Sequence, residues 1–379
     1  MKKETGFSLD KNVDFKNLDF KTISKKRKEE HLEITMNKDV SFKKISPGFE
    51  KFSFTHRALP DLDMDEINLS TEIFGKILSL PLMLAPLVGG TERTKEINRN
   101  LAKVAAKFKI AMGIGSQRAA IEDIEVEETF KVRKTAPDIL LFANLGAVQL
   151  NYGFSLEQCN KAVDMIEADC LILHLNSLQE AFQHEGNHNF KDLAKKISMI
   201  CRNAAYPVIV REVGFGISEE IANELLEAGV SGIDVGGAGG TSWIEVEKNR
   251  TASNIFKKVA DDFCEWGIPT SDSILSVKKA AENRKKTEKI SGKSNNPVRI
   301  IASGGIRSGM DVAKAIALGA DIAGIGLPAL KNIYLSVDKC IEYIMEIALG
   351  LRIAMFGIGA SSIAELKNSK YLKKKKETF

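Results

Sequence analysis

The sequence has few features that would place the protein in a membrane or outside the cell. Its five cysteines are scattered and none forms a Cys-x-x-Cys pair, which argues against a disulfide framework or a zinc site and fits a reducing compartment. No apolar run reaches the roughly 18 residues of a membrane span. The first residues are polar and charged, unlike a signal peptide. We therefore expect a soluble, cytoplasmic protein without a membrane partner.

An excess of charge of one sign is also missing. The 54 basic and 50 acidic side chains leave a formal net charge of +4, and the basic residues are spread along the chain. Nucleic-acid binding is therefore not expected. A lysine cluster, Lys373–Lys376, lies at the extreme C-terminus. We interpret residues 369–379 as a solvated basic tail, with a membrane or nucleic-acid contact as the alternative.

The chain does contain a regular alternation of short apolar runs and helical patterns. Eight runs are continuously apolar, which is typical of strands that are buried on both faces of a parallel sheet. Eight strand–helix units predict a TIM (β/α)₈ barrel of the α/β class, because a doubly wound sheet normally uses fewer. The predicted strands are 82–86, 110–113, 139–143, 170–174, 208–211, 232–235, 299–302 and 322–325.

We expect one barrel domain over residues 25–368, with an N-terminal extension whose first part, 1–24, is mobile. A long insertion, 237–297, separates the sixth and seventh strands. It exceeds what one crossover helix requires and is a candidate lid or oligomer contact. Its segment Lys278–Asn296 is basic and polar, which favours a mobile surface loop.

Glycines mark the ends of several predicted strands. The last two strands end in Gly304-Gly305 and in Gly326. Backbone amides at successive strand ends are how the last quarter of a TIM barrel holds a phosphate. Gly89-Gly90 and Gly236–Gly240 follow other strands, so the lining suits a large planar heterocycle that is anchored by its phosphate. For any single glycine pair, a tight turn remains the alternative.

Polar side chains gather at two further places. Asn176, Gln179 and Glu180 follow His174 at the end of the fourth strand. A carboxylate there can ligate a hard cation, while amide and imidazole groups orient an anionic substrate; His174 taken alone is equally well a core histidine. Near the N-terminus, the segment Arg27–His31 gathers three potentially cationic groups. It is either a solvated helix face or a diphosphate clamp over the barrel mouth.

Together these elements resemble the type 2 isopentenyl-diphosphate isomerases, FMN-dependent enzymes on a (β/α)₈ barrel. The resemblance runs from about Arg27 to Leu366, and the order and number of its motifs are specific to that family. The motifs are Arg27-Lys28-x-Glu30-His31, Gly115-Ser116-Gln117-Arg118, Asn144-Leu145-Gly146-Ala147, His174-Leu175-Asn176-x-x-Gln179-Glu180, Glu212-Val213-Gly214-Phe215-Gly216, Asp234–Thr241, Ala302–Gly309 and Leu351–Phe356.

The resemblance implies an isomerase of isoprenoid biosynthesis in which reduced FMN is the acid–base of a 1,3-allylic proton shift between isopentenyl and dimethylallyl diphosphate. NAD(P)H would only reduce the flavin, Glu180 would hold a Mg²⁺, and the protein would form a homotetramer or larger homo-oligomer. The implied catalytic residues are Gln179, His174 and Glu180. The implied substrate-binding residues are Arg27, Lys28, His31, Arg118, Asn176 and Gln179. The implied FMN-binding residues are Val88, Gly89, Gly90, Ser116, Asn144, Arg211, Thr241, Gly304, Gly305, Arg307, Pro328 and Ala329.

The chain departs from the family pattern at three places. Val88 stands where the family usually has threonine, which removes a hydroxyl that would face the flavin. Arg211 stands where lysine is usual, and it keeps the positive charge but cannot donate a proton at ordinary pH. Glu185-Gly186-Asn187-His188 replaces a usual Asp-Arg pair.

The sequence is compatible with two other functions. The first is an FMN-dependent oxidoreductase, such as a 2-hydroxy-acid dehydrogenase. Those enzymes resemble one another in using a histidine base near the end of the seventh strand. No histidine follows His188, which argues against that chemistry. The second is a paralogue that binds FMN or a prenyl diphosphate without turnover.

Overall fold

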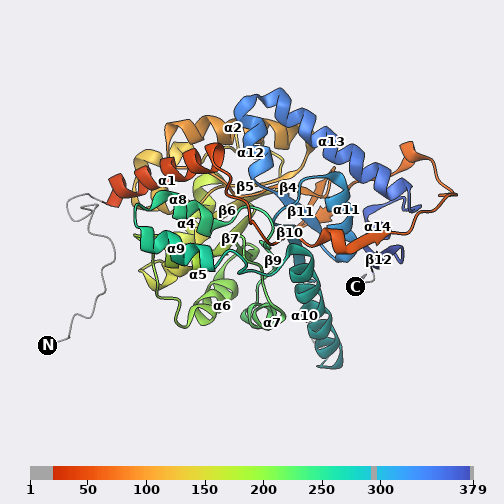
Figure 1. Ribbon diagram of the computed structural model, residues 1–379. Coiled ribbons are helices and arrows are strands. Elements are labelled where there is room, and N and C mark those ends of the chain that lie inside the picture. The colour runs from red at the N-terminus through yellow and green to blue at the C-terminus, as the bar shows by residue number, and fades with distance from the viewer. Residues whose placement is uncertain (1–19, 292–296, 376–379) are drawn as a thin grey trace.

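The computed structural model describes residues 20–291 and 297–375. Within them, eight parallel strands close into a barrel in the order β4-β5-β6-β7-β8-β9-β10-β11. This confirms the TIM-barrel prediction and each predicted strand. The strands lie at the centre of Figure 1, with helices around them. Their bounds are β4 Leu82–Leu84, β5 Ala111–Gly113, β6 Leu141–Gly146, β7 Cys170–Leu175, β8 Val208–Glu212, β9 Gly232–Asp234, β10 Arg299–Ser303 and β11 Ile322–Ile325.

The helices begin at local signals in the sequence. α2 and α11 each start with a reciprocal capping box, Thr91 with Thr94 and Ser308 with Asp311, which satisfies amides that the first helical turn leaves free. The helices that follow barrel strands are α2 Glu92–Phe108, α3 Arg118–Glu122, α4 Leu156–Ile166, α5 Ser177–Phe182, α6 Leu193–Asn203, α7 Glu219–Ala228, α11 Gly309–Leu318, α12 Leu327–Leu335, α13 Val337–Phe356 and α14 Ile363–Lys367. Short 3₁₀ helices are Phe49–Lys51, Met64–Glu66, Ile124–Thr129 and Ala147–Asn151.

A hairpin closes the N-terminal end of the barrel. Its strands, β2 Thr71–Ile73 and β3 Lys76–Leu78, are joined by Phe74 and Gly75, both at positive φ, as a two-residue hairpin turn requires. Ile73 and Leu78 are buried in the same cluster as the side chains of the barrel interior. Because this end is filled, a ligand site has to lie at the opposite, C-terminal end of the strands.

The N-terminal extension begins in a helix. α1 spans Phe20–Asn37, so the expected boundary at residue 25 falls inside it; residues 1–19 of the expected mobile segment lie outside the described residues. After α1 the chain pairs with the loop that follows β9: the Ser242 amide donates to the Val40 carbonyl at 2.8 Å. In Figure 1, α1 lies beside α8, Trp243–Arg250, and the two helices are in contact. The extension is thereby attached at the C-terminal end of the barrel.

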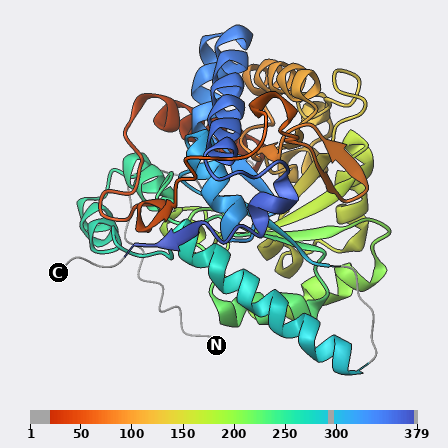
Figure 2. The same ribbon diagram turned by 90° about the vertical axis from the view of Figure 1, so that its right-hand side faces the viewer.

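The insertion between β9 and β10 consists of three helices, α8, α9 Asn254–Asp262 and α10 Thr270–Ser291. The prediction of a mobile loop over Lys278–Asn296 is therefore wrong up to Ser291, and residues 292–296 lie outside the described part. α10 packs against α7 through buried side chains such as Ile274 and Val277. Its later part is rich in Lys, Glu, Ala and Arg, which are strong helix formers, and it projects away from the barrel (Figures 1 and 2).

The expected basic tail is partly a strand. β12, Leu372–Lys374, pairs antiparallel with β1, Phe52–Phe54. The interpretation of residues 369–379 as a tail is therefore wrong at this strand, whereas its Lys373 and Lys374 side chains are exposed, as expected of a solvated segment. An unpaired strand edge offers backbone donors and acceptors whatever the charge of the side chains that join it, and composition alone does not reveal such an edge. Residues 376–379 lie outside the described part.

All five cysteines are free thiols. Burial raises the pKa of Cys340 to about 11, which is typical of an unreactive structural cysteine. Across residues 20–291 and 297–375, no helix combines the length and the apolar character of a membrane span.

Candidate active site

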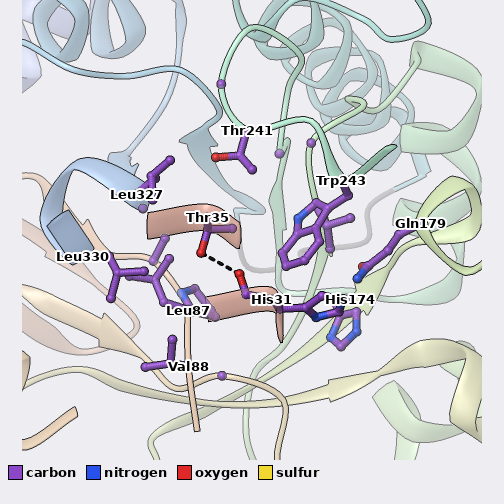
Figure 3. Close-up of a pocket in the computed structure, with 18 of the residues that line it drawn as sticks. His31, Thr35, Leu87, Val88, His174, Gln179, Thr241, Trp243, Leu327 and Leu330 are labelled. Atoms are coloured by element: carbon purple, nitrogen blue, oxygen red, sulfur yellow. Dashed lines mark hydrogen bonds between the residues drawn. The ribbon is translucent and has the colours of Figure 1, made fainter. Parts of the chain in front are cut away.

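A cavity of about 600 Å³ opens at the C-terminal end of the barrel strands, a volume typical of ligand pockets. Loops that follow all eight strands line it, together with one face of α1. Figure 3 shows an apolar part formed by Leu87, Val88 and Leu330, and a more polar part that includes His174 and Gln179. The predicted strand ends therefore do converge on one site.

Nearly all of the predicted site residues line this cavity. The two exceptions are Gly90 and Ala329, which lie behind the lining. The Gly90 amide donates to Thr129 Oγ1 at 2.9 Å, and Ala329 is fully buried. The predicted residues that line the cavity are Arg27, Lys28, His31, Val88, Gly89, Ser116, Arg118, Asn144, His174, Asn176, Gln179, Glu180, Arg211, Thr241, Gly304, Gly305, Arg307 and Pro328.

α1 presents its cationic groups to the cavity. Arg27, Lys28 and His31 are spaced so that they share one helix face, and each of them lines the pocket. Lys28 Nζ donates to the Ser116 carbonyl at 3.3 Å and lies 4.9 Å from the centre of the Phe130 ring. Burial, and secondarily the neighbouring Arg27, lowers the pKa of Lys28 to about 7. This face of α1 therefore belongs to the site, and the solvated-face alternative is excluded.

An ion-pair network, which the sequence analysis missed, holds α1 in place. His31 Nε2 lies 2.8 Å from Glu247 Oε1 on α8. Arg250, one turn further along α8, binds Glu247 at 2.6 Å, Glu30 at 3.1 Å and Glu185 at 2.9 Å. Burial alone would raise the pKa of Glu247, but His31 and Arg250 outweigh it and hold that pKa below its ordinary value.

The network also accounts for one departure from the family pattern. Glu185, in the segment that replaces the usual Asp-Arg pair, has its cationic partner in Arg250 on α8. A sequence signal for the network did exist, since Glu247 and Arg250 stand three residues apart on a helix. That Glu30, His31 and Glu185 converge on these two residues depended on the folded chain.

α5 brings the second polar group to the cavity. Glu180 is buried, and its two carboxylate oxygens accept from Asn176 Nδ2 at 2.8 Å and from the Asn187 amide at 2.5 Å. Gln179 lines the cavity from the same helix. Among the described residues, no three His, Cys, Asp or Glu side chains cluster as a ready-made metal site. Glu180 would therefore need oxygen ligands from a substrate and from water to hold a divalent cation.

The tautomer of His174 follows from its neighbours. Asn144 Nδ2 donates to the Ile114 carbonyl at 3.0 Å, which turns Asn144 Oδ1 toward His174 Nδ1 at 2.8 Å. Nδ1 therefore carries the proton, and Nε2 remains an acceptor. Burial, with a further contribution from Arg211, lowers the pKa of His174 to about 4. The imidazole is accordingly neutral at physiological pH. Both polar ends of the Asn144 side chain are committed to this arrangement.

Arg211 is held in place at the C-terminal end of β8 by a buried ion-pair partner. Its Nη1 is paired with Asp234 Oδ2, and Asp234 also accepts from Ser303 Oγ at 2.5 Å. Asp234 is fully buried, whereas the Arg211 side chain is 12% exposed and lines the cavity. A positive charge is thus held in one position at the ends of β8 and β9, where the family usually has a lysine.

The glycines after β9 and β10 form a tightly packed cradle. Gly304 and Gly305 have φ of 111° and 68°, a left-handed region that favours glycine. A Cβ on Gly304 would lie 2.1 Å from the Gly237 carbonyl oxygen, and one on Gly240 would lie 2.5 Å from the Gly305 nitrogen. Side chains are excluded here, so a ligand can approach the backbone directly.

The helix beside this cradle has an uncapped N-terminus. α12 begins after Gly326 without a side-chain cap, whereas the first turn of α11 is capped by Ser308 and Asp311. An uncapped helix N-terminus offers free amides and a favourable dipole to an anion. The residues present therefore fit a cofactor that carries a phosphate.

Comparison with known proteins identifies the family of the chain. Residues 21–137 and 174–374 match the FMN-dependent dehydrogenase family. An isopentenyl-diphosphate delta-isomerase of Nostoc sp. is 44% identical over 90% of this chain and 94% of its own length. One from Synechocystis sp. is 46% identical over 90% of this chain and 93% of its own length.

Solved structures share the barrel at much lower identity. A flavocytochrome b2 structure superposes with a TM-score of 0.64 at 16% identity, covering 90% of this chain and 82% of that one. A lactate oxidase of Pediococcus acidilactici superposes with a TM-score of 0.60 at 21% identity, covering 91% and 87%. At these identities the likeness shows the fold alone. The sequence relatives are far closer, and the chain belongs to the family of isopentenyl-diphosphate delta-isomerases that are built on the FMN-dependent dehydrogenase barrel.

Proposed function

We propose that this protein interconverts isopentenyl and dimethylallyl diphosphate by a 1,3-allylic proton shift with bound, reduced FMN and Mg²⁺. The observation that carries the proposal is that a single cavity is lined both by the glycine cradle with the uncapped α12 and by the cationic face of α1 with Glu180. The first arrangement suits a cofactor phosphate, and the second suits a diphosphate with its metal ion. Family membership supports the same assignment.

The FMN-binding groups come from the barrel strands. Gly304, Gly305 and the start of α12 would hold the FMN phosphate, while Arg211 would place a positive charge beside the isoalloxazine ring. When bound and reduced, FMN supplies the acid–base group for the proton shift. Thr241 and Val88 line the same cavity, as do the other predicted FMN-binding residues apart from Gly90 and Ala329.

The substrate-binding groups come from α1 and α5. Arg27 and Lys28 would bind the diphosphate, and Glu180 would hold a Mg²⁺ whose other ligands are phosphate oxygens and water. His174, neutral and with a bare Nε2, is suited to accept a hydrogen bond and not to neutralise a phosphate. Gln179 would orient the reacting end of the substrate.

The apolar part of the cavity suits the short hydrocarbon chain of the substrate. Leu87, Val88 and Leu330 line it (Figure 3), and they would exclude water from the allylic carbons. The shift breaks one C–H bond and forms another two carbons away, so no net oxidation occurs.

The oxidoreductase alternative finds no support at the end of the seventh strand. β10 ends at Ser303 and continues into Gly304 and Gly305, so this position has no histidine to serve as a base. We further propose NAD(P)H as the flavin reductant, a homotetramer or larger homo-oligomer, and a cytoplasmic location without membrane or nucleic-acid partners. These points rest on the family resemblance and the composition.

An anaerobic assay with isopentenyl diphosphate, Mg²⁺ and reduced FMN tests the proposal. The purified protein should be yellow or take up added FMN, and it should form dimethylallyl diphosphate. A protein that binds FMN without product formation would favour the non-catalytic paralogue. A colourless protein that takes up no FMN would exclude both the isomerase and the FMN-dependent oxidoreductase hypotheses.

Substrate affinity should depend on the protonation of Lys28. With its pKa near 7, the ammonium form is abundant at pH 6.5 and scarce at pH 8.5, so binding should weaken about 25-fold between these values if only the charged form binds the diphosphate. The ionic neighbours that shift this pKa are Arg27 on α1, which lowers it, and Glu122 on α3, which raises it. The measurement is the Kd of isopentenyl diphosphate by calorimetry as a function of pH. The Lys28→Met variant should bind isopentenyl diphosphate weakly at every pH. A pH profile of the Kd that is identical to that of the wild-type protein would contradict the assignment.

Restoring a hydroxyl at Val88 should strengthen FMN binding. Val88→Thr is nearly isosteric, and one new hydrogen bond is worth about 0.5–1.5 kcal/mol, which corresponds to roughly a two- to tenfold lower Kd. Fluorescence titration of the flavin-free protein with FMN would measure it. Weaker binding in the variant would show that this position faces no flavin acceptor.

A further inference from the structure

Three buried polar atoms at the cavity have no hydrogen-bond partner. They are Ser24 Oγ, Asn176 Oδ1 and Gln183 Nε2, and all three residues line the pocket. Ser24 is 4% exposed, and Asn176 and Gln183 are each 3% exposed. Buried polar groups are almost always satisfied in folded proteins. Unsatisfied ones around a ligand cavity therefore indicate that the ligand supplies the missing partner.

Ser24 belongs to the cationic face of α1. It precedes Arg27 by three residues and Lys28 by four, so the three side chains lie on one side of the helix. All three line the cavity. A hydroxyl can donate to an oxyanion, and here it extends the cationic surface by one helical turn toward the N-terminus.

Gln183 occupies the corresponding place on α5. It follows Gln179 by four residues and Glu180 by three, at the C-terminal cap of that helix. Its unpartnered atom is an amide nitrogen, which is a donor. Arg27 Nε lies 3.9 Å from Glu185 Oε1, only two residues beyond Gln183. Arg27, one turn after Ser24 on α1, therefore lies near the segment that follows α5.

We propose that Ser24 and Gln183 are diphosphate-binding residues, which donate hydrogen bonds to oxygens of the substrate diphosphate alongside Arg27 and Lys28. This inference rests on the proposed function and deepens it. Two unsatisfied donors beside fixed positive charges match an anion with several oxygen acceptors. The free atom of Asn176 is an acceptor, so that residue belongs with the cation beside Glu180 and not with the phosphates.

The test separates ligand binding from stability. Ser24→Ala and Gln183→Leu each remove a donor that has no partner within the protein, so the melting temperature of the ligand-free holoenzyme should stay the same or rise. The Kd of isopentenyl diphosphate should increase about tenfold or more for each variant, as expected for a lost hydrogen bond to a charged group. Calorimetry on the oxidised holoenzyme with Mg²⁺ measures the Kd without turnover.

Ser273→Ala is the matched control. Ser273 is equally buried, but its hydroxyl donates to the Ile217 carbonyl at 2.9 Å and accepts from the Ile217 amide at 2.8 Å, and it does not line the cavity. This variant should have a lower melting temperature and an unchanged Kd.

The outcomes are distinguishable. If the wild-type holoenzyme binds isopentenyl diphosphate and both cavity variants bind it with the same Kd, the inference is overturned and the proposed function still stands. A lower melting temperature in both variants with an unchanged Kd would likewise overturn it, because the two groups would then be structural. No binding of isopentenyl diphosphate by the wild-type holoenzyme would overturn the proposed function itself, and with it this inference.

Discussion

Glu180→Gln should lower the Mg²⁺-dependent turnover of isopentenyl diphosphate by roughly a thousandfold, because a metal-bound transition state is stabilised by several kcal/mol and about 1.4 kcal/mol corresponds to a factor of ten. The substitution keeps the shape of the side chain. The single carboxamide oxygen can still accept from one of the two donors, Asn176 Nδ2 or the Asn187 amide, so only one hydrogen bond is lost. The protein should therefore fold normally and retain the absorption spectrum of its bound flavin.

A Mg²⁺ titration of activity measures this effect, and Glu245→Gln is its control. Glu245 is also a buried glutamate, and it pairs with Lys248 at 3.4 Å, outside the cavity. Neutralising it should leave the Mg²⁺ dependence intact. Equal activity of Glu180→Gln and wild type at every Mg²⁺ concentration would remove this carboxylate from the mechanism.

Arg211→Met should both destabilise the protein and weaken FMN binding. The substitution leaves the fully buried Asp234 without its cation, and removing one partner of a buried ion pair costs about 3–5 kcal/mol. It also removes the positive charge that would lie beside the flavin ring. Denaturant unfolding of the flavin-free protein measures the first effect, and FMN titration measures the second.

A double variant separates these two effects. In Arg211→Met/Asp234→Asn no buried charge is left unpaired, and an asparagine oxygen can still accept from Ser303 Oγ. Stability should recover most of its loss, whereas FMN affinity should stay low. Arg211→Lys keeps a positive charge and should retain most of both properties. Recovery of FMN affinity in the double variant would mean that Arg211 serves the fold and not the cofactor.

The strands of the barrel could be predicted because their signal is local. Runs such as Cys170–His174 are apolar throughout, and such runs recur between helical patterns along the chain. A strand that is buried on both faces consists almost entirely of apolar residues. The functional residues at the strand ends could be expected to converge for the same reason, since the C-terminal ends of the strands of a closed parallel barrel lie at one end.

The two wrong predictions concern segments whose structure depends on a distant partner. Between Lys278 and Ile290 the stretch has no loop signal other than its charge, and α10 is held by its packing on α7. Leu372–Lys374 becomes a strand because β1 lies beside it. The residue composition of a segment predicts whether its side chains are exposed to solvent. It does not predict which strand edge or helix face that segment will pack against.

By itself, the sequence determined that the chain forms an eight-stranded barrel with a phosphate-type glycine cradle and two groups of polar side chains for a second anion. The tertiary structure alone decided which atoms remain available to a ligand. It commits Asn144 to His174, pairs Arg211 with Asp234, and leaves Ser24 and Gln183 without partners. The physical reason is that hydrogen bonds and ion pairs depend on distances of a few ångströms between residues that are far apart in the chain, and those distances exist only once the barrel has closed.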